Sequence, residues 1–164
     1  MSTFISRGMG RRVAATAAIA TLSVAFLAAC EKPSPVAQLT VNDKTVTAEA
    51  TCYNDGDTIK RAEVIKCLAK KSGHSISMSE LDQLRIGVDP ETADDGWYLF
   101  ANGQQLYPDR IDKTYFQLKG ENLLFNQQEG GFADTVQLQI VQAADEGGQL
   151  KDVKGMWDFK VKRD

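Results

Sequence analysis

Apolar and polar residues alternate along most of the chain after residue 38. A period of two is typical of strands that bury one face. The clearest examples are Val136–Ile140 and Trp157–Val161, where every second residue is apolar. The remaining alternating segments are 39–41, 45–52, 75–79 and 84–88, and a further strand is expected at 114–118. Short strands separated by turn residues predict a mainly β fold, namely an immunoglobulin-like antiparallel β-sandwich of about seven or eight strands.

A further strand is predicted over Trp97–Ala101, which is apolar or aromatic on both faces. Such a strand is expected to be covered on both sides. Asn102-Gly103 follows it and predicts a type I′ hairpin turn. The turn-rich segment Asp145–Gly148 lies between the last two alternating segments, so we expect these to form an antiparallel hairpin.

One segment follows a helical period instead. Asp57 or Thr58 can cap a helix that runs to about Lys71, with Gly73 as its stop. Apolar residues recur in it at three-and-four spacing and form one stripe, which comprises Ile59, Ala62, Ile65, Leu68 and Ala69. The sequence therefore predicts one short helix within the β fold.

The N-terminal segment has the features of a lipoprotein signal peptide. The first 12 residues contain three arginines and no acid, and residues 13–27 are almost wholly apolar. Those 15 residues are fewer than the roughly 20 that a membrane-spanning helix needs. Leu27-Ala28-Ala29-Cys30 resembles a lipobox, in which a cysteine after small residues receives a lipid. The alternatives are a transmembrane anchor, or an ordinary cleavage site with an incidental cysteine.

This segment divides the chain into three expected parts. Residues 1–29 are the signal peptide, 30–38 are the lipidated Cys30 with a tether containing Pro33 and Pro35, and 39–164 form the β-sandwich domain. Two acyl chains suffice for stable attachment to a bilayer. We therefore expect the protein on the extracytoplasmic face of the cell membrane, held there by covalent diacylglycerol on Cys30, with no other cofactor.

The other two cysteines, Cys52 and Cys67, are expected to form a disulfide, because exported proteins meet an oxidising environment. A redox-active pair is the alternative, but such pairs favour the close Cys-x-x-Cys spacing.

The charge of the mature chain bears on its partners. Without the three signal-peptide arginines, 16 of the 19 basic residues remain against 22 acidic residues, a net charge of −6. A mildly acidic surface of mixed sign argues against nucleic acid and anionic head groups as partners, because these need clustered lysine and arginine.

Four carboxylates lie close together in the sequence at Asp89, Glu91, Asp94 and Asp95. Oxygen ligands clustered in a loop are what calcium prefers, but the spacing does not match an EF-hand. The alternative is turn chemistry, in which Asp89 caps a short helical turn that begins at Pro90. We keep calcium as a weak candidate and expect no metal.

The sequence contains no catalytic motif that we can identify, so we do not expect an enzyme. There is no Gly-x-Ser-x-Gly elbow, P-loop, dinucleotide fingerprint or His-Glu-x-x-His pair. The only histidine, His74, has no cysteine near it in sequence, which favours a solvated or structural role. Tyr98, Phe100 and Tyr115 offer a candidate aromatic surface for a glycan or peptide, although core packing explains such residues equally well.

Several local motifs resemble those of a family of small actinobacterial, streptomycete-type lipoproteins, catalogued as a domain of unknown function. The motifs are Cys30–Pro33, Cys52–Gly56 with Cys67 after it, Ile86–Pro90, Gly96-Trp97 with Asn102–Gln104, and Trp157-x-Phe159-x-Val161. The resemblance covers essentially the whole mature chain. It implies a lipid-anchored exterior location and supplies no activity, ligand or catalytic residue.

These observations favour a lipid-anchored binding or interaction module whose partner is an envelope protein or a wall component. One alternative is a cell-envelope enzyme that acts on wall glycan or peptide through converging carboxylates. Another is a structural accessory subunit of a membrane complex, which an exposed apolar patch would favour.

Overall fold

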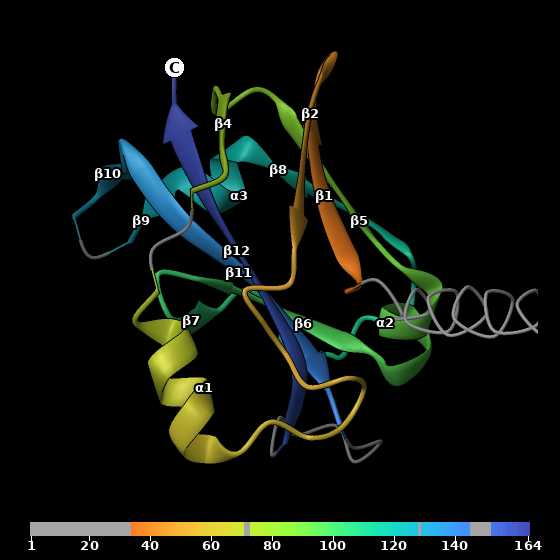
Figure 1. Cartoon of the computed structure of the whole chain (residues 1–164). Coiled ribbons are helices and arrows are strands. Elements are labelled where there is room, and N and C mark those ends of the chain that lie inside the picture. Colours follow the sequence, from red (N-terminus) through yellow and green to blue (C-terminus); the bar gives the residue numbers. More distant parts are fainter. Residues whose placement is uncertain (1–33, 71–72, 128, 145–151) are drawn as a thin grey trace, which may run out of the picture. The chain divides into compact units, whose positions relative to one another are not determined.

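The computed structural model describes residues 34–70, 73–127, 129–144 and 152–164. All of them belong to one compact unit, Ser34–Asp164, shown in Figure 1. The expected signal peptide, Cys30, the end of the expected helix at Lys71, and the Asp145–Gly148 turn lie outside the described residues.

The described chain is mainly β, as predicted, and its strands form two larger sheets and a small hairpin. The eight longer strands are β1 (Val36–Val41), β2 (Lys44–Glu49), β4 (Ser75–Met78), β5 (Gln83–Val88), β6 (Trp97–Ala101), β8 (Tyr115–Lys119), β11 (Thr135–Ala143) and β12 (Val153–Arg163). The two-residue strands are β3 (Cys52–Tyr53), β7 (Gln104–Gln105), β9 (Phe125–Asn126) and β10 (Gly131–Phe132).

The first sheet has the strand order β2-β1-β5-β8, and its neighbours pair antiparallel. The second has the order β3-β12-β11-β6-β7, with β4 also pairing with β12. That last pair is parallel, whereas the alternation predicted antiparallel strands throughout. Two strands can pair with the same edge of β12, because β3 lies along the beginning of β12 and β4 lies along its end. Strands β9 and β10 form the separate hairpin.

Apolar side chains from both sheets form the main core. Trp157, Phe159 and Val161 are fully buried on one face of β12, as their alternation predicted. Leu39 of β1 and Ile86 of β5 belong to the same cluster, so the two larger sheets face each other across it. Burial of such side chains is the main favourable contribution to folding.

The eight longer strands coincide with the eight segments that the patterning predicted, with bounds that differ by a few residues. One of these segments, 45–52, is divided. The strand β2 ends at Glu49, and after Ala50 and Thr51 the chain enters the other sheet as β3. Alternation alone does not reveal such a change of sheet, because it continues across both strands.

The predicted turn at Asn102-Gly103 is confirmed. Both residues have positive φ, 49° and 78°, and the flanking residues Ala101 and Gln104 pair across the hairpin. Positive φ at both central positions defines the type I′ turn, whose twist matches that of the strands.

Three helices are described: α1 (Arg61–Leu68), α2 (Pro90–Asp95) and α3 (Gly120–Leu124). Helix α1 is shorter than predicted, because Lys60 rather than Asp57 or Thr58 is its N-cap residue. Helix α2 is the short helical turn expected after Asp89, and α3 was not predicted.

The domain begins earlier than predicted. Val36, Ala37 and Gln38, expected in the tether, belong to β1 and pair with β2, and Ala37 and Gln38 also pair with β5. Ala37 is fully buried, so the alternation of Leu39 and Val41 extends back through it. The expected tether of residues 30–38 therefore ends before Val36.

Candidate binding site

The disulfide between Cys52 and Cys67 is confirmed and ties α1 to β3, with Cα atoms 6.0 Å apart. The disulfide belongs to a second apolar cluster. This cluster lies on the far face of the six-stranded sheet, which is the face that points away from the main core. Cys67, Ile59, Val141, Val153 and Met156 form this cluster, and Cys52, Val64 and Phe100 pack against it. The disulfide thus lies among packed apolar side chains.

Two of the four carboxylates of the candidate calcium loop, Asp89 and Asp95, contact different partners. Asp89 Oδ2 accepts a hydrogen bond of 2.7 Å from the backbone N–H of Val36. Both carboxylate oxygens of Asp95 lie 2.9 Å from Lys154 Nζ, and Oδ2 also accepts a bond from Gln142 Nε2. Among the described residues, no group of three or more His, Cys, Asp or Glu side chains is placed to hold a metal ion.

The three residues of the candidate aromatic surface do not come together. Tyr98 is only 1% exposed, and it shares the far face of the six-stranded sheet with the half-buried Phe100. Tyr115 is 47% exposed, but it lies on the four-stranded sheet, where its hydroxyl accepts a bond from Gln117 Nε2. These residues therefore form no single surface.

A different site is formed by a surface hollow of about 510 Å³ between the β6–β7 hairpin and α3. Strand β9 and the start of β11 complete its wall. Its lining side chains that bear carboxamides are Asn102, Gln104, Gln105, Asn122, Asn126 and Gln127. The other lining residues are Ala101, Leu106, Leu123, Leu124, Phe125, Ala133 and Val136.

No charged side chain is present among these lining residues, although a quarter of the chain is charged. A carboxamide offers both a donor and an acceptor, so it can match hydroxyl and amide groups equally. Asn102, Gln104, Gln105, Asn122 and Gln127 are exposed to solvent. The hollow is therefore suited to an uncharged polar ligand.

The β6–β7 side of the hollow is fixed by Asn102. Its backbone N–H donates to Gln137 O, and its Oδ1 accepts from the backbone N–H of Gln137, at 2.8 and 2.9 Å. Gln105 Nε2 donates to the carbonyl of Tyr107 at 2.6 Å. These bonds attach the turn to β11 and orient two of the carboxamides.

The α3 side is held by the turn between β4 and β5. The backbone N–H groups of Gly120 and Glu121 donate to the carbonyls of Asp82 and Glu80, both at 2.8 Å. A Cβ on Gly120 would lie only 2.2 Å from Ser79 O, so this close approach requires glycine. The turn therefore sets where α3 begins, and with it the position of Asn122.

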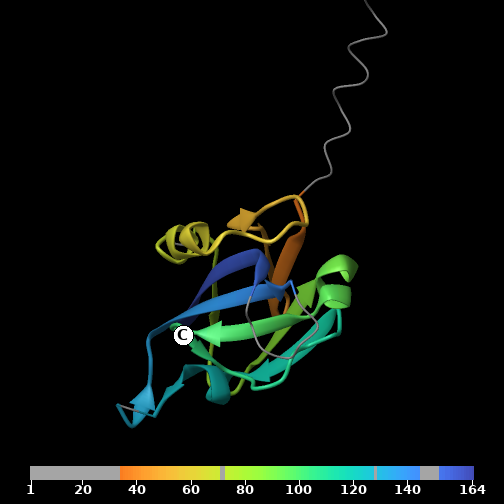
Figure 2. The ribbon, with the colours of Figure 1, turned by 90° about the horizontal axis from the view of Figure 1, so that it is seen from below.

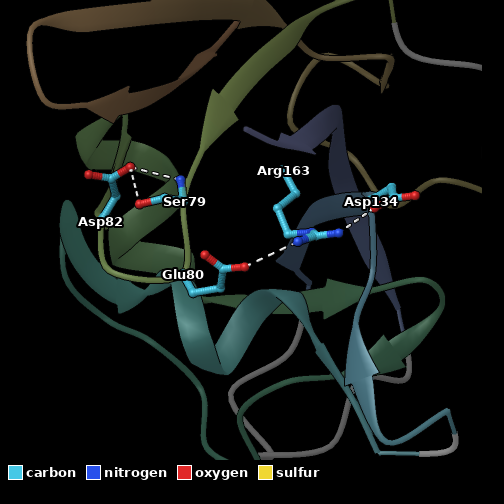
Figure 3. Close-up of polar contacts among 5 residues, drawn as sticks. All are labelled: Ser79, Glu80, Asp82, Asp134 and Arg163. Carbon is cyan, nitrogen blue, oxygen red and sulfur yellow. Dashed lines mark hydrogen bonds and ion pairs between the residues drawn. The ribbon is translucent and has the colours of Figure 1, made fainter.

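The same turn carries Asp82, whose carboxyl group has a shifted pKa. Asp82 Oδ2 accepts bonds from the backbone N–H and the hydroxyl of Ser79, at 2.8 and 2.9 Å (Figure 3). The backbone bond from Ser79, with further bonds from Asn42 and the Ser79 hydroxyl, lowers the pKa of Asp82. These bonds stabilise the charged carboxylate in the folded protein.

Arg163, near the end of β12, bridges two carboxylates. Its guanidinium donates to Asp134 at 2.6 Å and to Glu80 at 3.3 Å, as Figure 3 shows. The bond to Asp134, and then the bond to Glu80, raise the pKa of Arg163. These contacts link the β4–β5 turn to the residues before β11.

Aromatic side chains lie beside the hollow in the β9–β10 hairpin. Phe125, which lines it, and Phe132 are 46% and 39% exposed, and their rings meet edge to face with centroids 5.6 Å apart. The sequence predicts that the apolar segment Leu123–Phe125 either tucks into an end of the sandwich or forms a docking patch; Leu123 and Leu124 are buried, and Phe125 is exposed. Phe132 has no such signal in the sequence. The carboxamides were equally missed, because their residues are separated in the chain and only the fold brings them together.

None of the helices in the described part of the chain combines the length and the hydrophobicity that a membrane span requires. Comparisons of the chain with family models, with curated proteins and with solved structures gave no match.

Proposed function

We propose that the protein is a lipid-anchored binding module on the extracytoplasmic face of the cell membrane, and that its ligand is an uncharged glycan of the envelope. The anchor is supported by the lipobox-like Leu27–Cys30 after a short apolar segment. The ligand class is supported by the uncharged, carboxamide-lined hollow.

A glycan suits this hollow because each sugar presents several hydroxyl groups and an apolar ring face. Hydroxyl groups are both donors and acceptors, as carboxamides are. The exposed ring of Phe125 offers an apolar surface at the same site. A charged ligand would find no opposite charge among the described lining residues. Together these features favour a neutral sugar chain.

The immunoglobulin-like character of the fold is also a proposal. It is supported by two sheets that share one core and by the predominance of antiparallel pairs.

Titration of the full-length protein with a tetramer of N-acetylglucosamine tests the ligand class. We expect saturable binding, weakened about fivefold by Gln104→Ala and by Asn122→Ala, since one hydrogen bond contributes about 1 kcal/mol. The matched control is Gln83→Ala, which removes an exposed carboxamide from the four-stranded sheet. Equal affinity of Asn122→Ala and Gln83→Ala would contradict the assignment. Mass analysis of the recovered tetramer shows whether it was only bound or was also cleaved. Cleavage is the outcome expected if the protein is a cell-envelope enzyme.

A further inference from the structure

The outward face of helix α1 carries several exposed apolar side chains. Ile65 and Leu68 are 62% and 47% exposed, and Ala62 and Ala69 beside them are exposed as well. These residues belong to the stripe that the sequence predicted, but the disulfide turns Cys67 toward the sheet, so most of the stripe faces outward. Grouped apolar side chains on a surface are typical of an interaction site.

The charges around this stripe are mainly positive. Segment 60–70 has one acidic side chain, Glu63, and four basic ones, which are Lys60, Arg61, Lys66 and Lys70. At helical spacing, Arg61 and Lys66 lie on either side of Ile65. Asp55 and Asp57 precede the helix. The segment is therefore locally basic although the mature chain is acidic, and an apolar stripe flanked by basic residues is typical of helices that lie on a lipid surface.

Helix α1 shares a surface hollow with the first described residue of the domain. Ser34, the first described residue, lines a surface hollow of about 480 Å³ together with Glu63, Lys66 and Lys70. In Figure 2, α1 and the beginning of β1 lie toward the same side of the domain, and the β9–β10 hairpin lies on the other side. Cys30 precedes Ser34 by four residues, and four extended residues reach at most about 14 Å.

We propose that this face of α1 rests on the surface of the lipid bilayer, as a second membrane contact beside the anchor. The inference depends on the proposed lipidation of Cys30. A lipid on Cys30 would hold the helix within reach of the head groups, so even a weak contact would be occupied because its effective concentration is high. The carboxamide hollow and the β9–β10 hairpin would then remain open to the envelope.

Fluorescence quenching by brominated lipids tests this contact in the mature, lipidated protein. The protein is reconstituted into vesicles of phosphatidylcholine and phosphatidylglycerol, and Ile65→Trp places a reporter on the stripe. Leu81→Trp is the matched control, because Leu81 is 96% exposed in the β4–β5 turn. The native Trp97 and Trp157 are fully buried, so their signal forms a constant background.

We expect the Ile65→Trp reporter to be quenched about threefold more strongly than the Leu81→Trp reporter, because an interfacial helix enters the acyl boundary. Equal quenching in vesicles that carry the protein would overturn the inference and leave the anchor intact. A protein that fails to float with the vesicles would overturn both proposals. Oligomerisation through α1 without quenching would identify a second copy as the occupant and would likewise overturn it.

Charge reversal supplies an independent test. Arg61→Glu with Lys66→Glu, added to Ile65→Trp, should reduce quenching to the level of the Leu81→Trp control while the protein still floats. Arg85→Glu, which changes an exposed charge on the four-stranded sheet, should leave quenching unchanged. Unchanged quenching after the double reversal would overturn the role assigned to the basic residues.

Discussion

The disulfide should contribute measurably to the stability of the domain, because it is the main attachment of α1 to the six-stranded sheet. Cys67 is the one buried residue within this helix, at 3% exposure, while Val64 is half-buried. Replacing both cysteines, Cys52→Ala with Cys67→Ala, removes the covalent link without leaving a free thiol. The substitutions also remove two sulfur atoms from the apolar cluster that contains Val141 and Met156.

The expected magnitude follows from the length of the closed loop. The cysteines are 15 residues apart, and closing a loop of this size stabilises the folded state by about 3 kcal/mol on the chain-entropy model. For a domain of this size, 1 kcal/mol corresponds to about 4 °C in Tm. The double variant should therefore unfold about 12 °C below the wild type.

Thermal unfolding followed by circular dichroism measures this difference. Reduction and alkylation of the wild type serves as the control, and it should reproduce the Tm of the double variant. A decrease smaller than about 3 °C would refute the reasoning, because the loop entropy would then not contribute to global unfolding. That result would indicate that α1 detaches locally before the sheets unfold.

Three further predictions concern the packing around the main core and the hollow. Gly120→Ala should destabilise the domain by about 3 kcal/mol in urea unfolding, since the new Cβ would meet a carbonyl oxygen of the β4–β5 turn; unchanged stability would contradict this. Trp157→Phe should lower the free energy of unfolding by about 2 kcal/mol, because the buried indole N–H donates to Pro35 O at 3.0 Å. A decrease below about 0.5 kcal/mol would show that this bond contributes little to stability. For Asp82, the lowered pKa means that its stabilisation is present above the unfolded pKa and is lost as pH falls through the folded pKa. Asp82→Asn should therefore reduce the loss of folding stability as the pH is lowered. An unchanged dependence of stability on pH would exclude Asp82 as a source of that loss.

Much of the fold was predictable because burial on one side of a sheet imposes a period of two. Phe159 and Val161 alternate with Lys160 and Lys162; the first two are fully buried in the structure, and the two lysines are exposed. Asn102-Gly103 was equally informative, since few residue pairs accept positive φ at both positions. The disulfide followed from cysteine number and the inferred compartment.

The errors have physical causes as well. The parallel pair of β4 with β12 depends on contacts between distant segments, which alternation does not encode. Tyr98 was considered as a surface residue, but its strand is buried on both faces. The stripe of α1 was recognised, but the direction in which it points is set by the bond to Cys67. The hollow was missed because its carboxamides come from segments far apart in the chain.

The mass of the mature N-terminal peptide, isolated from cell membranes, decides whether the protein is lipid-anchored. We expect a peptide that begins at Cys30 and carries a diacylglycerol on its sulfur. A mature chain that begins at any other residue, or a Cys30 peptide without fatty acid, would contradict the anchor, and with it the proposed contact of α1 with the bilayer.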